Sequence, residues 1–355
     1  MRIAQVAPLY ESVPPKLYGG TERVVSILTE ELVREGHEVT LFSSGDSETT
    51  ARLVPVCPES LRLNKECMDQ LAHHVLMLEQ VFSELHNFDI IHFHIDYLHF
   101  PLTRRTGAVN VTTLHGRLDI PDLQPLYRNF SEMPVVSISD AQREPLPWIN
   151  WQGTVYHGLQ EDCFLFHKDS EEYLAFLGRV SPEKGLDEAI KIAKRAGMKL
   201  RIAAKVDNED KEYFESVIKP MLKDPLIEYI GEIGNPEKCE FLGSAAALLF
   251  PINWPEPFGL VMIEAMACGT PVVAYSSGSV PEVLEDGVTG FLVNNVDTAA
   301  EAVGRLPEIE RSRCRHTFEQ RFSARRMAQD YLAIYEKLIG GESEPLALSD
   351  GVSVG

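Results

Sequence analysis

The stretch that decides the fold reads PINWPEPFGLVMIEAMACGTPVVAY and runs from Pro251 to Tyr275. It contains two glutamates, Glu256 and Glu264, with seven residues between them. The preceding ALLF indicates a buried strand before a proline-rich loop, and LVMIEAMACG predicts a short helix that ends at Gly269. Glu256 falls on the predicted loop and Glu264 inside the predicted helix. A carboxylate in so apolar a helix is costly to bury without a partner, so the alternative is that Glu264 faces solvent.

The start of this predicted helix is suited to an anion. The N–H groups of Phe258, Gly259 and Leu260 would lack partners within the helix, so they can hold a phosphate or sugar oxygen. Sugar hydroxyls would suit the two carboxylates, because they are neutral and donate hydrogen bonds. We therefore interpret the glutamates as one carboxylate from the loop and one from the helix, on either side of an anion-binding helix start.

Length and composition indicate an ordinary globular chain with two domains. The chain has 355 residues, of which 44% are hydrophobic and 24% charged, and no apolar run predicts a membrane-spanning helix. The opening segment MRIAQVAPLY is typical of a first strand rather than of a signal peptide. The six cysteines lie far apart without metal-site spacing, which favours reduced thiols in a cytoplasmic protein.

The charge of the chain excludes some classes of partner. A net charge of −20 argues against nucleic acid, because phosphate backbones are bound by a basic face. The same charge gives no general attraction to anionic membranes, so we expect membrane association to be weak or absent. Arg104 and Arg105 are a candidate basic patch, for which a solvated loop is the simpler interpretation.

The chain alternates strands and helices in two series. The first contains RIAQVAP, HEVTLFSS, DIIHFHID, NVTTLHG and PVVSISD, with a predicted helix from Thr21 to Glu35. The second contains EYLAFLGR, KLRIAAK, IEYIGE, AAALLFP, TPVVAY and GFLV, with a predicted helix from Gly185 to Ala196. This alternation predicts an α/β fold with parallel sheets and helices on both faces. The aperiodic segment 155–173 separates the two series, and the segment 341–355 is predicted to be disordered.

In open parallel sheets, ligands bind at the carboxyl ends of the strands. Gly19 and Gly20 precede a predicted helix and would let the backbone approach an anion, but a plain turn capped by Thr21 explains them equally well. His115 ends the strand segment NVTTLHG and can donate a hydrogen bond to a substrate, although a lone histidine is more often structural.

Other strand ends carry polar residues with alternative explanations. His92 and His94 share one face of a strand, but without a clear third ligand they do not predict a metal site. Arg179 and Lys184 flank a turn after EYLAFLGR, where an arginine fork and a lysine point charge can neutralise a diphosphate without metal. The alternative for these two cations is a solvated turn. Downstream, GSVPEVLEDGVTGFLV predicts turns into a short helix and a strand, which would close one wall of the site.

Together these segments resemble the retaining glycosyltransferases of family 4. The resemblance is carried by EPFGLVMIEAMACGTPVVA with its E-x7-E pattern, by GRVSPEKG upstream and by GSVPEVLEDGVTGFLV downstream. The acceptor-side domain and linker of the family are matched in order by YGGTERVV, DIIHFH, TTLHG, SISDAQRE and VYHGL. The last helices of the family are matched by RFSARRMAQDYLAIYEKLI. The resemblance implies the GT-B fold, in which two Rossmann-like domains with parallel sheets face each other across a cleft.

The resemblance also implies domain bounds. Residues 1–158 would form the acceptor-side domain, to which a crossover helix at about 325–340 returns. Residues 159–324 would form the domain that binds the nucleotide-sugar donor.

Roles at the donor are implied in the same way. Glu256 would contact hydroxyls of the donor sugar near the reacting carbon, and Glu264 would accept hydrogen bonds from the ribose hydroxyls. Arg179 and Lys184 would hold the diphosphate and stabilise it as it leaves. His115 would contact the donor sugar and help to position charge at the transition state.

Backbone groups complete the implied site. Gly19 and Gly20 would approach the phosphate from the other domain, and the amides from Phe258 to Leu260 would fit sugar and phosphate oxygens. The family more often has a glycine-rich loop at the position of Lys205 and Asp207, so the resemblance assigns these two residues no role.

The expected activity is retaining transfer of a hexose from a nucleotide-diphosphate sugar to a hydroxyl acceptor, without metal or other cofactor. UDP-glucose is the favoured donor and GDP-mannose the next, and the acceptor is expected to be a sugar, natural product or glycan precursor. Two alternatives share the fold. A nucleotide-sugar 2-epimerase would lack the EPFG…EAMACG order, and a non-catalytic nucleotide-sugar binder would bind the donor without transfer.

Overall fold

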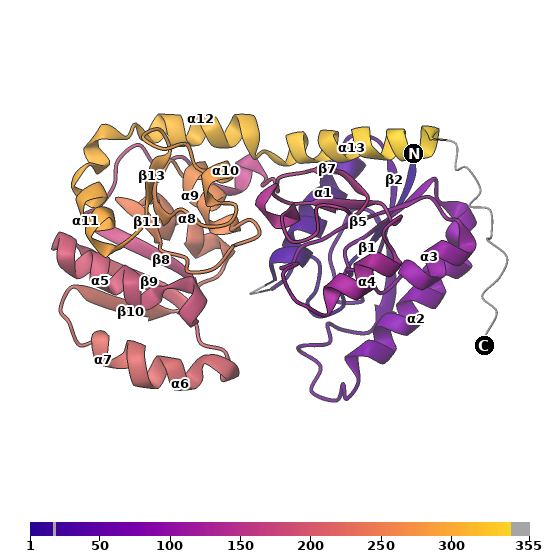
Figure 1. The fold of residues 1–355 in the computed structure, drawn as a ribbon, viewed down its shortest axis with the longest axis horizontal. Helices are drawn as coiled ribbons and strands as arrows, with labels where there is room; N and C mark the ends of the chain where they lie inside the picture. The colour runs from indigo at the N-terminus through magenta and orange to yellow at the C-terminus, as the bar shows by residue number, and fades with distance from the viewer. Residues whose placement is uncertain (17–18, 342–355) are drawn as a thin grey trace.

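The computed structural model describes residues 1–16 and 19–341, which fold into two lobes (Figure 1). Within these residues, the first lobe contains a seven-stranded sheet whose neighbouring strands all pair in parallel. Its strands in spatial order are β3 (Arg52–Cys57), β2 (Glu38–Ser44), β1 (Arg2–Val6), β4 (Ile90–Phe93), β5 (Asn110–Thr113), β6 (Val135–Ser137) and β7 (Trp151–Thr154). Its helices include α1 (Gly20–Arg34), α2 (Gln70–Ser83), α3 (Phe100–Thr106) and α4 (Leu123–Asn129).

The second lobe is built on a six-stranded parallel sheet, counted over the same residues. Its strands in spatial order are β10 (Ile227–Gly231), β9 (Lys199–Lys205), β8 (Tyr173–Arg179), β11 (Ala247–Phe250), β12 (Val272–Tyr275) and β13 (Gly290–Val293). Its helices include α5 (Leu186–Ala196), α6 (Lys211–Tyr213), α7 (Lys219–Met221), α8 (Asn235–Gly243), α9 (Leu260–Ala267), α10 (Val280–Val283), α11 (Val296–Gly304) and α12 (Arg311–Arg321).

The sequence pattern explains why these sheets are covered on both faces. Leu248 and Leu249 are adjacent in β11 and therefore point to opposite faces, yet both are almost fully buried. The helix α5 packs against β8 and β9 of its sheet. Its buried residues Leu186, Ile190 and Ala193 follow helical spacing and therefore lie on one face. The α/β class with two parallel sheets, as expected from the sequence, is confirmed.

The structure differs from the sequence prediction at several elements. The outer strands β3 and β7 were not predicted, because β3 contains Pro55 and is largely half-exposed and β7 is half-buried throughout. An edge strand pairs on one side and can do without a continuous apolar run. Arg104 and Arg105 lie in the last turn of α3 and not in a loop, so that interpretation was wrong. Gly19, and not Thr21, precedes the first turn of α1.

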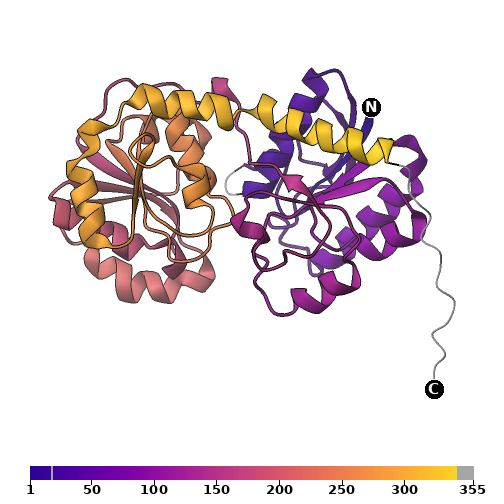
Figure 2. The ribbon, with the colours of Figure 1, turned by 45° about the horizontal axis from the view of Figure 1, so that its top comes forward.

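The chain returns to the first lobe at its C-terminal end. The helix α12 packs against α9 of the second lobe, whereas α13 (Ala324–Gly340) lies along the first lobe against α1 (Figures 1 and 2). At the crossing, the Leu159 N–H donates to the Phe322 carbonyl at 2.9 Å, and two chain segments therefore join the lobes side by side. The segment predicted to be disordered lies, except for residue 341, outside the described residues.

Candidate functional site

A cavity of about 670 Å³ lies between the lobes, at the carboxyl ends of strands from both sheets. The first lobe contributes residues that follow β1, β4 and β5, and the second contributes the last residues of β8 and β9 and residues that follow β11. All the residues to which the resemblance assigns a role line this cavity: Gly19, Gly20, His115, Arg179, Lys184, Glu256, Phe258, Gly259, Leu260 and Glu264. The fold therefore gathers them around one space, and their individual roles stay predictions.

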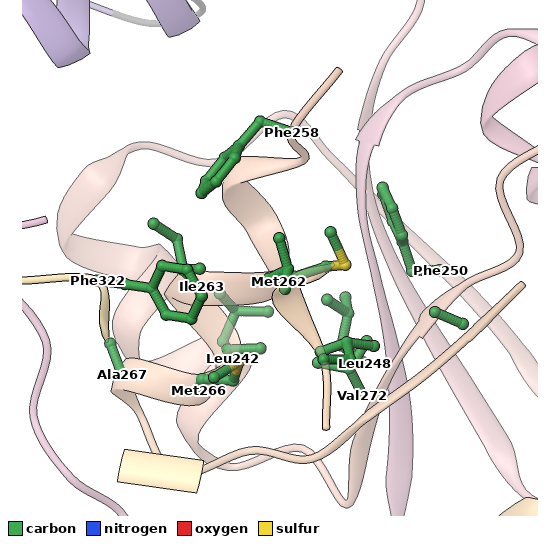
Figure 3. Close-up of a cluster of buried hydrophobic side chains, with 14 of the residues drawn as sticks. Leu242, Leu248, Phe250, Phe258, Met262, Ile263, Met266, Ala267, Val272 and Phe322 are labelled. Carbon is green, nitrogen blue, oxygen red and sulfur yellow. The ribbon is translucent and has the colours of Figure 1, made fainter. Parts of the chain in front are cut away.

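The start of α9 is fixed by local geometry. Gly259 adopts the left-handed conformation with φ of +80°, and a Cβ there would lie 2.9 Å from the terminal methyl of Met262. Glycine is therefore required at this position. Behind the turn, Met262, Ile263 and Met266 pack among buried side chains (Figure 3). The amides of Phe258, Gly259 and Leu260, as predicted, donate no hydrogen bond to any described residue.

Glu264 is buried and is paired with an arginine from the other lobe. It is 3% exposed, so the alternative that it faces solvent is wrong. Its carboxylate accepts a hydrogen bond from the guanidinium of Arg23 on α1, and both side chains line the cavity. Burial opposes ionisation of this carboxyl, but the nearby guanidinium holds the pKa of Glu264 below its ordinary value. The carboxylate is therefore charged, with a countercharge supplied across the lobes.

Glu256 is held by two donors and by its own backbone. The Lys184 ammonium lies 2.5 Å from its carboxylate, and the indole N–H of Trp254 donates to the same oxygen at 3.0 Å. A Cβ at Gly278 would lie 2.4 Å from the Glu256 nitrogen, and the Ser279 N–H donates to the Glu256 carbonyl at 3.0 Å. The segment after β12 therefore packs directly on the Glu256 loop, but none of residues 278–293 lines the cavity, so the expectation that this segment closes one wall of the site was wrong.

Arg179 lies within a group of carboxylates. Its guanidinium is 3.0 Å from Glu183, 3.9 Å from Asp207 and 3.6 Å from Asp210. Lys205 lies 3.1 Å from Asp207 and also lines the cavity. The Asp210 side chain is 15% exposed and faces Arg179, so acidic side chains balance the charge of this cation.

His115 is a neutral side chain at the edge of the cavity. Burial lowers its pKa to about 3, so the ring is uncharged at neutral pH. Its Nε2 lies 2.9 Å from Nδ1 of His94, and its ring stacks on His157 with centroids 5.4 Å apart. The ring of His92, in contrast, is hydrogen-bonded within the protein and does not line the cavity. Among the described residues, no group of three or more histidine, cysteine or acidic side chains is arranged to hold a metal ion.

Sequence reasoning missed several residues of the cavity wall. Besides Arg23, these include Glu22 and Asp96 on the first lobe, and burial raises the pKa of Glu22 to about 6. Asp96 also has a positive φ of 50°, which is uncommon for a residue other than glycine and often marks a functional position. Asp96 directly follows the strand segment IHFHI, so its place at a strand end was the available signal. The signal for Arg23 was weaker, since it is one charge in the first turn of a helix.

Relatives and solved structures of similar length match this chain. An uncharacterized glycosyltransferase of Methanocaldococcus jannaschii is 26% identical over 358 residues, covering 86% of this chain and 89% of that protein. N-acetyl-alpha-D-glucosaminyl L-malate synthase of Bacillus anthracis is 26% identical over 366 residues, covering 89% and 93%. Sucrose-phosphate synthase from Thermosynechococcus elongatus superposes with a TM-score of 0.80 at 18% identity, covering 95% and 99%. Anabaena HepE in complex with UDP-glucose superposes with a TM-score of 0.69 at 18% identity, with the same coverage.

The two parallel sheets and the cavity between them make up the GT-B fold. Residues 162–323 match the family described as glycosyl transferases group 1, and residues 18–143 match glycosyltransferase family 4. The chain therefore belongs to the glycosyltransferases of the family 4 type. No helix among the described residues has the length and apolar character needed to cross a bilayer.

We predict that Arg23 and Glu264 are strongly coupled in stability. Arg23→Met leaves a buried carboxylate without its countercharge and should lower the free energy of unfolding by about 3–5 kcal/mol. Adding Glu264→Gln should recover part of this loss, so urea unfolding of the double-mutant cycle should show an interaction of about 0.5–3 kcal/mol.

Lys219→Met is the matched control, because it breaks a pair with Glu215 in which both side chains are 58% exposed. Its effect should stay within about 1 kcal/mol. Simple additivity of the Arg23 and Glu264 substitutions would contradict the pairing.

Proposed function

We propose that the protein transfers a hexose from a nucleotide-diphosphate sugar to a hydroxyl acceptor, with retention at the anomeric carbon. The observation that carries the proposal is the arrangement of Glu256 and Glu264 on either side of the free amides at the start of α9, in one interlobe cavity. Superposition on HepE, which has been solved with UDP-glucose, supports a nucleotide-sugar donor.

The second lobe would bind the nucleotide. Glu264 would accept hydrogen bonds from the ribose hydroxyls, which are neutral donors that can replace the Arg23 guanidinium. The diphosphate would lie at the start of α9, where the amides of Phe258, Gly259 and Leu260 point outward from the helix end. Gly20 would approach from the first lobe, because a Cβ there would already lie 3.7 Å from a methyl group of Leu260.

Cations near the diphosphate would lower the barrier. Lys184 and Arg179 are both paired with carboxylates in the absence of ligand, and a diphosphate would compete for them. Negative charge grows on the phosphate as the sugar leaves, so positive groups already in place stabilise the transition state more than the bound substrate. These two residues would therefore act as catalytic groups as well as binding groups.

The proposed reaction is a front-face displacement. The bond between the anomeric carbon and the phosphate oxygen breaks, and the acceptor oxygen bonds to the same face of that carbon. The acceptor proton passes to the departing phosphate oxygen, so no separate base is required. Glu256 would contact sugar hydroxyls near this carbon, and its carboxylate is already engaged by Lys184 and Trp254. That engagement disfavours a double displacement through Glu256.

The likeness to HepE supports a choice of donor, whereas the similar proteins do not select an acceptor. UDP-glucose is the first donor to test because of the HepE likeness, and GDP-mannose is the second. The similar proteins differ in their printed acceptors, as malate and sucrose phosphate illustrate, so they select no acceptor. We propose a sugar, natural product or glycan precursor as the acceptor and, from the spacing of the six cysteines, activity in the cytoplasm.

The first prediction for this function concerns stereochemistry. With an α-linked donor such as UDP-glucose, an NMR time course should show an α-linked product. A β-linked product would contradict retention. Donor binding without transfer would support a non-catalytic binder, and conversion of the donor to its C2 epimer would support an epimerase.

The second prediction concerns charge stabilisation without metal. Initial rates should be unchanged after EDTA treatment, because Lys184 and Arg179 supply the countercharge. Lys184→Ala should lower the rate by about a hundredfold, as expected for loss of a stabilising group at a developing charge. Lys191→Ala is the control, because Lys191 pairs with Asp187 and Glu188 and does not line the cavity. Loss of activity with EDTA and its recovery with magnesium would overturn the metal-free mechanism.

A further inference from the structure

A chain of buried hydrogen bonds begins at His115 and runs away from the cavity. Nε2 of His115 lies 2.9 Å from Nδ1 of His94, and Nε2 of His94 lies 2.8 Å from the side-chain oxygen of Gln5. The amide nitrogen of Gln5 then donates to the hydroxyl of Tyr335 at 3.2 Å. These contacts connect the cavity to the helix α13.

The chain continues under α13 across the middle of the first sheet. The Tyr335 hydroxyl is 2.7 Å from Nδ1 of His92, whose Nε2 is 2.7 Å from the hydroxyl of Thr113. The Thr113 hydroxyl is in turn 2.8 Å from that of Tyr331. Apart from His115, every member is at most 3% exposed, so water does not compete for these bonds. The proposed transfer reaction uses none of these groups except His115.

The positions of the protons along the first half of the chain follow from simple rules. Burial lowers the pKa of His94 well below its ordinary value, and His115 is neutral as well, so each ring carries a single N–H. The carbonyl oxygen of Gln5 can only accept, so Nε2 of His94 carries the proton and its Nδ1 accepts. Nε2 of His115 must then be the donor to that Nδ1. The other nitrogen of His115, Nδ1, keeps a lone pair.

The amide of Gln5 sets the direction of these bonds. If the amide turned by half a rotation, its nitrogen would donate to His94, and the proton of His115 would move to Nδ1. In the structure, the amide nitrogen donates to the Tyr335 hydroxyl, which holds this orientation when its own proton goes to Nδ1 of His92, 2.7 Å away. Nδ1 of His115 is enclosed and has no partner among the described residues. It is the ring nitrogen left for a substrate hydroxyl.

We propose that Gln5 and His94 are positioning residues that hold His115 with its proton on Nε2, so that Nδ1 accepts a hydrogen bond from a hydroxyl of the donor sugar. This inference rests on the proposed function for the identity of the substrate. It reverses the direction considered from the sequence, in which His115 donates. A hydroxyl held at Nδ1 would orient the sugar ring for displacement, without charge on the histidine.

The chain offers a matched control for breaking a buried histidine bond. His99 lies between the hydroxyls of Thr103 at 2.8 Å and Thr112 at 2.7 Å, and it is fully buried. It does not line the cavity and has no hydrogen bond to His115 or His94. Thr112→Val therefore removes a similar bond from the strand that also carries Thr113, without touching the chain.

The first test reads the protons directly by nitrogen NMR of the full chain with labelled histidine, with His115→Phe used for assignment. Unsubstituted protein should show His115 in the Nε2–H form. Gln5→Met, which keeps the shape but removes both polar atoms, should shift the two ring nitrogens toward averaged positions. Tyr335→Phe should do the same to a smaller extent, and Thr112→Val should not. A proton on Nδ1 in the unsubstituted protein, or no change in Gln5→Met, would overturn the inference.

The second test is kinetic and uses the same variants. Gln5→Met should lower kcat about tenfold, because a misplaced orienting group weakens the reacting geometry. KM for the donor should change little, and Thr112→Val should match the unsubstituted protein. An unchanged kcat in both Gln5→Met and Tyr335→Phe would overturn the positioning role. If the unsubstituted protein transfers no sugar, the proposed function fails, whereas the NMR result still decides whether Gln5 sets the proton on His115.

Discussion

The structure depends on one buried carboxylate that needs a countercharge from the other lobe. Glu264 lies inside an apolar helix whose neighbours are packed around it, and Arg23 from the first lobe satisfies it. An unpaired charge at this depth would be strongly destabilising, so the pair favours the arrangement in which the two lobes lie close together. The same cavity contains the free amides at the start of α9. The interaction that joins the lobes therefore lies where a nucleotide would bind, and binding would exchange one partner of Glu264 for another.

Cations around the cavity are balanced by acid in the same way. Lys184 is paired with Glu256, and Arg179 lies among three carboxylates. This balance is consistent with a chain of net charge −20 that nevertheless offers a site for an anionic diphosphate. Selectivity would come from the geometry of the amides and from carboxylates that accept sugar hydroxyls, both of which are fixed by glycines at turns such as Gly259 and Gly278.

Much of the fold and part of the site could be predicted from the sequence. The apolar runs gave the central strands, because strands of a parallel sheet are buried on both faces, and the residues at their carboxyl ends gave the cavity wall. The edge strands β3 and β7 were missed because they do not need that pattern. Arg23 was missed because its partner lies 241 residues away, and no local pattern specifies which charge faces Glu264. The hydrogen-bond chain behind His115 was missed for the same reason, since it depends on how β1, β4, β5 and α13 meet, whereas Asp96 could have been found from its place at the end of a predicted strand.

The central claim is that a nucleotide-sugar binds between the lobes and engages both of them. Hydrogen–deuterium exchange of the full chain tests this most directly. It is measured without nucleotide and with either UDP or GDP, whichever binds more tightly. The account predicts slower exchange at two separate segments, residues 19–23 at the start of α1 and residues 258–264 at the start of α9. Slower exchange confined to one lobe, or located away from both segments, would contradict it.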